Sequence, residues 1–310
     1  MNNYAPEGTL ISTFENRELT ASYKGLERAL EKQIILEAPA FMCDHNFNLH
    51  VSLGGGIKGI MPRDEVQYSP KEETKDIAIL TRVGKSVCFK VIGFEKDSLG
   101  ETVAVLSRRC AQRECTTSFI ETLSPGDVIP ARITHLESFG AFVDIGCGII
   151  SLLSIDTISV SRISHPSARL AVGDSIYTVV KHIDEQGRIY VSERELLGSW
   201  EENAAIFNEG QTVKGIIRSV ENYGVFVELK PNLAGLAEYR DDVRPGQTAA
   251  VYIKSIIPEK MKIKLIIIDA HDAPTEREPL EYFIDTDAVT HIDSWTYSPP
   301  SSKKIIETIF

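Results

Sequence analysis

Two short segments of the sequence pair aromatic side chains three residues apart across a glycine. Phe139 and Phe142 flank Gly140, and Tyr223 and Phe226 repeat the pattern further along the chain. On a β-strand successive side chains point to opposite faces, so residues three apart are not both buried in the same way. An exposed ring stacks on nucleic-acid bases of any identity, which contributes about 1–3 kcal/mol per base. The spacing predicts a stacking platform in each segment.

The alternative is structural. Phe142 and Phe226 are either platform rings or core rings of the fold, whereas we expect Phe139 and Tyr223, which adjoin a glycine, to be exposed. Basic or imidazole side chains precede both segments, and cations beside stacked bases hold phosphates. These expected supporting residues are Arg132, His135, Lys214 and Arg218.

Both aromatic segments belong to an internal repeat. Residues 126–145 (GDVIPARITHLESFGAFVDI) align without a gap with residues 210–229 (GQTVKGIIRSVENYGVFVEL). A weaker copy occupies residues 47–53 (FNLHVSL), where Phe47 takes the first aromatic position and His50 the second. Copies at positions 47, 139 and 223 are too widely spaced for a solenoid and indicate tandem small domains.

Each copy has the pattern of short β-strands. Runs rich in Val, Ile and Leu alternate with glycine and polar turns, which predicts strands at 128–136, 142–145, 149–153, 175–183 and 188–192 in the second copy. The other copies end alike, with strands expected at 86–94 and 102–107, and at 249–257 and 261–268. Five short strands suit a closed barrel, because closure removes exposed sheet edges.

The predicted fold is therefore all-β, with three tandem five-stranded barrels joined by short helices. Apolar residues at helical spacing predict amphipathic helices within 17–36 and 193–207. The expected divisions are an N-terminal helical segment (1–30), a first, divergent barrel (31–109), a helical connector (110–123), a second barrel (124–192), a helical connector (193–209), a third barrel (210–269) and a C-terminal extension (270–310).

The complete pattern resembles the S1 domain, an RNA-binding module. The matching elements are G-x-x-[VI], then [FY]-G-[AV]-F-V-[DE]-[IL], a further glycine, and D-x-x-G-R-I-x-[VL]-S. The resemblance covers residues 31–269 and is most specific in the second and third copies. The order of the copies is also similar to that of the short S1-type ribosomal proteins of Gram-positive bacteria. It implies OB-fold barrels of the S1 type that bind single-stranded RNA across one face.

Residue by residue, the resemblance implies RNA contacts at Phe139, Phe142, Asp184 and Arg188 in the second copy, and at Tyr223, Phe226 and Lys262 in the third. Two sites depart from the family pattern. Ser154 replaces a family histidine in the second copy, while Glu238 and Ile257 replace the histidine and an aspartate in the third. A carboxylate in the RNA path repels phosphate, so the third face is either selective or contacts another partner.

Some of these residues have an equally simple structural interpretation. Asp184 and Arg188 flank a tight turn at 185–187 and are either RNA contacts or an ion pair across it. Lys262 is either an RNA contact or an ordinary solvated strand residue. In the first copy, Phe47 and His50 lack the intervening glycine, and residues 58–63 (KGIMPR) resemble a turn of the family's leading domains. Those domains look more like ribosome-docking modules, and we expect the same of this copy.

Short matches to nucleotide-binding and zinc-binding motifs occur in the sequence, but the residues around them do not fit those motifs. Residues 54–59 (GGGIKG) match G-x-G-x-x-G but precede Met-Pro-Arg rather than a helix, which predicts a turn between strands. Residues 84–86 (GKS) lack the earlier glycine of a phosphate loop. Cys110 and Cys115 have no second ligand pair, so zinc is not expected. We therefore expect no catalytic site, metal or cofactor.

Composition sets broader limits. Lys and Arg number 33 against 44 Asp and Glu, giving a net charge of -11, which argues against a simple polycation that coats nucleic acid. The three predicted barrels together are neutral, however, so the connectors and the tail carry this acidity. Five cysteines are an odd number and favour a reducing compartment. Without an apolar signal or a span of roughly 18 apolar residues, we expect a monomeric cytoplasmic protein with no membrane partner.

The predicted function is non-enzymatic binding of single-stranded RNA, specifically mRNA, in translation, with the small ribosomal subunit as a partner. The alternative is a protein-interaction scaffold or an accessory factor of RNA decay or transcription. A nuclease is disfavoured because no residues remain for a catalytic domain. The tail is expected to pack back on the third barrel, with a docking segment as the alternative, through Trp295, Tyr297, Ile305, Ile306, Ile309 and Phe310.

Overall fold

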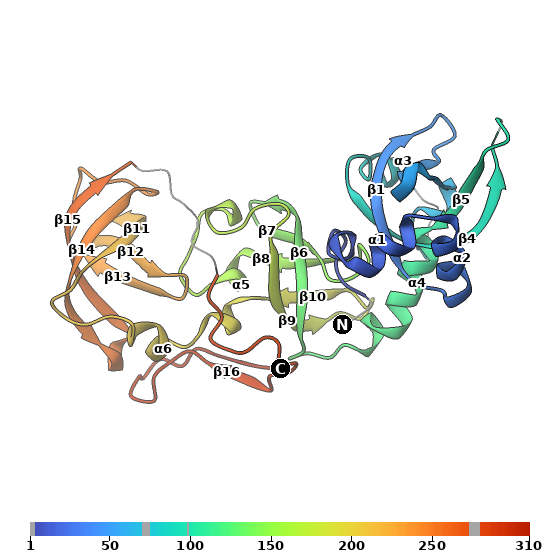
Figure 1. Ribbon diagram of the computed structural model, residues 1–310. Coiled ribbons are helices and arrows are strands. Elements are labelled where there is room, and N and C mark those ends of the chain that lie inside the picture. The colour runs from blue at the N-terminus through green and yellow to red at the C-terminus, as the bar shows by residue number, and fades with distance from the viewer. Residues whose placement is uncertain (1–3, 70–74, 98, 273–279) are drawn as a thin grey trace. The chain divides into compact units, whose positions relative to one another are not determined.

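The computed structural model describes residues 4–69, 75–97, 99–272 and 280–310 (Figure 1). The chain separates into two compact units, Met1–Leu123 with Asp144–Ile150, and Ser124–Val143 with Ser151–Phe310. In both units short strands close into five-stranded barrels. The expectation of a mostly β fold built from such barrels is confirmed, with helices added around them.

The barrel of the first unit has the strand order β1-β2-β3-β5-β4. Its pairs are antiparallel except for β3 with β5, which are parallel. The barrel encloses apolar side chains such as Leu49, Val51 and Phe89. Its strands are β1 (Leu36–Cys43), β2 (Leu49–Ser52), β3 (Lys58–Met61), β4 (Ser86–Lys96) and β5 (Thr102–Ser107). The glycine run at 54–56 forms the turn between β2 and β3, as predicted.

Helices surround this barrel: α1 (Phe14–Thr20), α2 (Tyr23–Lys32), α3 (Asp76–Leu80) and α4 (Arg108–Ser118), with 3-10 turns at Leu10–Ser12, Gly54–Gly56, Arg63–Glu65 and Ile120–Thr122. The amphipathic helix predicted within 17–36 is confirmed as α2, and α1 is a separate helix before it. Ser22 starts a new helix because its side chain accepts a hydrogen bond from the Gly25 N–H. The helix then ends at Lys32, before β1 begins.

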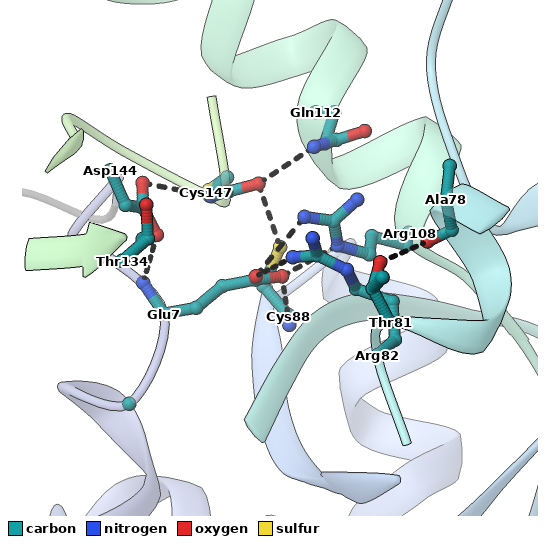
Figure 2. A network of polar contacts seen from close by, with 12 residues as sticks. Glu7, Ala78, Thr81, Arg82, Cys88, Arg108, Gln112, Thr134, Asp144 and Cys147 are labelled. Carbon is teal, nitrogen blue, oxygen red and sulfur yellow. Dashed lines mark hydrogen bonds and ion pairs between the residues drawn. The ribbon is translucent and has the colours of Figure 1, made fainter. Parts of the chain in front are cut away.

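Glu7 lies at the centre of a buried polar network in the first unit (Figure 2). Its carboxylate accepts hydrogen bonds from Arg108 Nε and Nη2 at 2.6 and 3.0 Å, and from the Cys88 N–H at 3.0 Å. Its own N–H donates to Asp144 at 2.7 Å. Burial would raise the Glu7 pKa, but the Arg108 guanidinium outweighs it and lowers that pKa. Burial and the nearby Glu7 charge raise the pKa of Asp144 to about 7.

Two closed barrels lie in the described part of the second unit (Figure 1). The earlier one has the order β10-β8-β7-β6-β9 and consists of β6 (Val128–Glu137), β7 (Gly140–Asp144), β8 (Ile150–Ser154), β9 (Ser175–Ile183) and β10 (Ile189–Ser192). The later one has the order β11-β12-β13-β15-β14 and consists of β11 (Thr212–Glu221), β12 (Gly224–Lys230), β13 (Leu233–Ala237), β14 (Thr248–Ile257) and β15 (Lys262–His271). We call them the middle barrel and the last barrel. Shorter elements are α5 (Ile155–Ile158) and 3-10 turns at Pro166–Ala168 and Pro258–Lys260.

The connector between these barrels consists of two short helical turns rather than one helix. A 3-10 turn (Arg194–Leu197) precedes α6 (Trp200–Ala204), so the single helix expected within 193–207 is wrong. Gly198 separates the two at φ 79°, and a Cβ there would lie 2.7 Å from the Phe283 ring. A left-handed backbone ends the first turn, and the capping box of Ser199 and Glu202 starts α6.

The C-terminal segment packs along both barrels of the second unit. Tyr297 is buried in the core of the last barrel, where Trp295 and Ile306 also pack. Phe310 packs against the core of the middle barrel. The expectation that the tail covers the last barrel is thus confirmed for these side chains, although Ile305 and Ile309 remain exposed. The tail ends in a hairpin of β16 (Ser294–Thr296) and β17 (Glu307–Ile309).

Candidate nucleic-acid interface

Both predicted aromatic pairs have the same geometry. Phe139 is 52% exposed and meets half-buried Phe142 edge to face, with ring centroids 6.0 Å apart and planes at 88°. Tyr223 is 69% exposed and meets Phe226 at the same distance and angle. Both inner rings, Phe142 and Phe226, are half-buried rather than fully enclosed. Each pair therefore offers one exposed ring on a fixed support.

The glycine of the motif explains the spacing. A Cβ on Gly140 would lie 2.4 Å from the Leu153 carbonyl oxygen, and one on Gly224 would lie 2.4 Å from that of Ala237. The neighbouring strand therefore passes too close for any side chain at this position. Only glycine at this position lets the residue with the exposed ring lie directly beside the end of the neighbouring strand, β8 or β13.

The middle barrel carries two further ring contacts. His135 stacks on Phe142 with ring centroids 6.3 Å apart, and its Nε2 lies 2.8 Å from Glu137 Oε1. A further stacked pair joins His182 of β9 to Tyr190 of β10, with centroids 4.3 Å apart and planes at 5°. Sequence reasoning missed this pair, because the strands that bring its members opposite each other were predicted without their register.

The turn after β9 holds the predicted polar pair. Arg188 Nε donates to Asp184 at 2.7 Å, and the backbone N–H groups of Gln186 and Arg188 donate to the same carboxylate at 2.9 Å. The backbone hydrogen bond from Arg188 is the main reason why the pKa of Asp184 is lowered. The ion-pair interpretation therefore describes this turn, although the Arg188 side chain remains mostly exposed.

The cations predicted around the last barrel lie in different surroundings. Arg218 is engaged by Glu228 through two hydrogen bonds of 2.8 and 2.9 Å, so it is not a free phosphate ligand. Lys214 lies opposite Ala250 on β14. It is five residues before Ser219, which is the strand partner of Phe226, so Lys214 is roughly 16 Å along β11 from the ring pair. Neither of these two cations stands free beside the rings.

Two exposed lysines lie on β15 instead. Lys262 is opposite Ile257, and Lys264 is beside Leu236, which itself pairs with Phe226. Neither lysine has an ion-pair partner among the residues that the structure describes. Glu238, the predicted departure from the family pattern, is exposed at the end of β13.

The first unit presents a different surface. Phe47, at φ 63°, packs against the barrel core and is covered by the Arg63 guanidinium 5.0 Å from its centroid. His50 is half-buried and lies 3.2 Å from Asp44. The exposed ring is Phe41, at 54%, with its centroid 6.2 Å from that of His50. Sequence reasoning missed Phe41 because it lies on the preceding strand, outside the motif.

Other kinds of site are not evident in the described residues. No cluster of His, Cys, Asp and Glu among them is suited to hold a metal ion. The five cysteines are free thiols. None of the described helices is long and apolar enough to span a membrane.

Comparison with known proteins agrees with these barrels. Residues 122–194 match the sequence model of the S1 RNA binding domain. The small ribosomal subunit protein bS1 of Staphylococcus saprophyticus is 27% identical over 84% of this chain and 67% of its own length. The bS1 protein of Staphylococcus haemolyticus is 25% identical over 87% of this chain and 72% of its own length.

A solved multidomain protein with nucleic acid binding domains from Streptococcus pneumoniae is 17% identical, covers 80% of this chain and 75% of that chain, and has a TM-score of 0.24. So low a score establishes no common arrangement. The family-model match at residues 122–194 covers the second copy of the repeat and its aromatic motif. Residues 122–194, which include the whole middle barrel, therefore match the S1 RNA-binding domain family.

Proposed function

We propose that this protein binds single-stranded RNA, and mRNA in particular, as a factor that acts in translation at the small ribosomal subunit. The observation that carries the proposal is the pair of identical aromatic platforms, each with an exposed ring held at 6.0 Å and 88° to a second ring. One of them lies in the segment that matches the S1 RNA binding domain. The ribosomal part of the proposal is supported by the names of the bS1 relatives.

All three barrels are, in this proposal, S1-type OB domains in tandem, with the limits expected from the sequence. The barrel at β1–β5 shares the strand order of the last barrel, which runs first, second, third, fifth, fourth around the circle. The first barrel supplies a weaker RNA surface, because Phe47 is covered and His50 is held by Asp44. It is the barrel assigned to ribosome docking.

RNA contacts divide by chemistry. Bases stack on Phe139 and Tyr223, and phosphates lie near Arg188, Lys262 and Lys264, whose charges are exposed. Stacking is insensitive to base identity and supplies about 1–3 kcal/mol for each base. The protein acts without catalysis or cofactor, as a monomer in the cytoplasm.

The test is titration of the purified protein with a fluorescein-labelled, unstructured 20-nucleotide RNA, followed by anisotropy. The double variant Phe139→Ala with Tyr223→Ala should bind at least about tenfold more weakly, since two stacked bases are lost. Phe14→Ala is the matched control, because Phe14 is an exposed ring on α1 outside the platforms. Equal affinity of the double variant and the wild type would exclude the platforms as the binding site.

A ribosome-associated role is tested separately. Tagged protein from cell extract should sediment with the small subunit, and ribonuclease should release the fraction that is held through mRNA. Sedimentation only as free protein would contradict the translational role while leaving RNA binding intact.

A further inference from the structure

A surface pocket of about 600 Å³ adjoins the platform of the last barrel. One wall is the segment of residues 160–164, which follows α5 in the middle barrel. The other wall is the start of the last barrel, with Glu221, Tyr223 and Phe226 among its residues. The volume is within the usual range for small-ligand pockets, and it suits one nucleotide.

The 160–164 wall is tied to the last barrel. The Val160 N–H donates to Asn232 Oδ1 at 2.9 Å, and the Ser161 N–H donates to the Pro231 carbonyl at 3.3 Å. Further along the same loop, Arg169 donates to Glu228 at 2.9 and 2.6 Å. The pocket is therefore a prearranged space rather than a gap between loose segments, which lowers the entropic cost of ordering it on binding.

Two charged side chains line this pocket without partners. Arg162 and Glu221 are exposed, and neither forms an ion pair or side-chain hydrogen bond with any residue that the structure describes. In the middle barrel, Glu137 occupies the position that corresponds to Glu221, but His135 engages it at 2.8 Å. The free carboxylate is thus particular to the last barrel.

A carboxylate beside a base-stacking ring has a definite chemical preference. It only accepts hydrogen bonds, so it favours a base edge that offers donors and disfavours one that offers acceptors. Guanine presents two adjacent donors on its Watson–Crick edge, the N1–H and the N2 amino group. Adenine, cytosine and uracil each place an acceptor next to their donor on that edge. The partial negative charge of this acceptor would face the negative carboxylate and repel it.

We propose that this pocket takes a single guanine of the bound RNA, with its base on the Tyr223 ring, its Watson–Crick edge on Glu221 and its phosphate near Arg162. This inference rests on the proposed function and makes it more specific, because it gives one barrel a base preference that stacking lacks. It also explains why an acidic side chain lies on an RNA-binding surface.

The experiment compares uridine nonamers that carry either G or A at the centre, by anisotropy at low salt. Wild-type protein should bind the G strand at least about fivefold more tightly, the discrimination of one good bidentate contact. Glu221→Gln should remove this preference, because the amide places a donor against a donor. Arg162→Ala should weaken both strands equally, as expected for a phosphate contact.

Glu137→Gln is the matched control and should keep the preference. The substituted residue is exposed, so thermal unfolding should be unchanged in Glu221→Gln, and this is measured on the same samples. Equal binding of both strands by wild-type protein, or an unchanged preference in Glu221→Gln, would overturn the guanine pocket and leave RNA binding standing. Failure to bind either strand would overturn the proposed function itself.

Discussion

Glu228 is the residue whose replacement should destabilise the second unit most clearly. Its buried carboxylate accepts four hydrogen bonds, two from Arg169 and two from Arg218, at 2.6 to 2.9 Å. Glu228→Gln keeps the shape but removes the negative charge. The buried Arg169 guanidinium then loses its counter-ion, and burial already lowers its pKa. Removing one partner of a buried pair costs about 3–5 kcal/mol of the free energy of unfolding.

Two comparison variants make the prediction quantitative. Arg218 is half-buried, and its removal leaves the pair of Arg169 and Glu228 intact, so Arg218→Ala should cost only about 1 kcal/mol. Arg188→Ala breaks an exposed pair and should change stability by less than about 1 kcal/mol. The expected order of destabilisation is Glu228→Gln, then Arg218→Ala, then Arg188→Ala.

The assay can follow the second unit alone. The chain has two tryptophans, Trp200 and Trp295, and both lie in that unit. Urea unfolding followed by tryptophan fluorescence should show the Glu228→Gln midpoint lower by roughly 1–5 M, given a slope of about 1–3 kcal/mol per M. A midpoint within about 0.3 M of wild type would refute the conclusion that this carboxylate neutralises a buried charge.

Three further results are expected. Burial raises the pKa of Glu193 to about 8, so above pH 4.5 the native state holds a proton that the unfolded state loses. The free energy of unfolding should therefore fall between about pH 4.5 and 8. Urea midpoints measured across this pH range should show the decline in wild type and a smaller decline in Glu193→Gln. Gly224→Ala should destabilise by about 1–3 kcal/mol, because its φ is 152° and its Cβ would lie 2.4 Å from the Ala237 carbonyl; a stability unchanged by calorimetry would contradict this. Tyr190→Ala should weaken RNA binding about five- to tenfold in the anisotropy assay if its pair with His182 extends the platform, and full affinity would confine binding to the predicted rings.

Local patterns were sufficient to predict many of the strands. The runs at 175–183 and 102–107 coincide with β9 and β5, because alternation and turn residues are properties of neighbouring positions. The helix within 193–207 was predicted less well, since Gly198 interrupts an apolar periodicity that looks continuous. A single capping residue or left-handed glycine outweighs several apolar positions at helical spacing.

The platform rings were predictable because their spacing is local, whereas their ionic surroundings were not. Arg218 looked like a free cation, yet its partner Glu228 lies ten positions later and also binds Arg169 from another barrel. Phe41 and the pair of His182 and Tyr190 depend on strand register. Such pairings follow from tertiary contacts that no single segment encodes.

One motif position shows why family membership does not fix the site. Asp144 and Glu228 occupy the same place in the repeat, and both are buried. Asp144 accepts backbone N–H groups from Glu7, Gly146 and Gly148, whereas Glu228 accepts two guanidinium groups. The repeat therefore conserves a buried acceptor at this position but not its partner. The partners that differ most, Glu7 and Arg169, come from segments outside the motif, and the 160–164 segment joins the last barrel in the same way. Specificity in this protein should accordingly be sought where barrels meet rather than within the motif that identifies them.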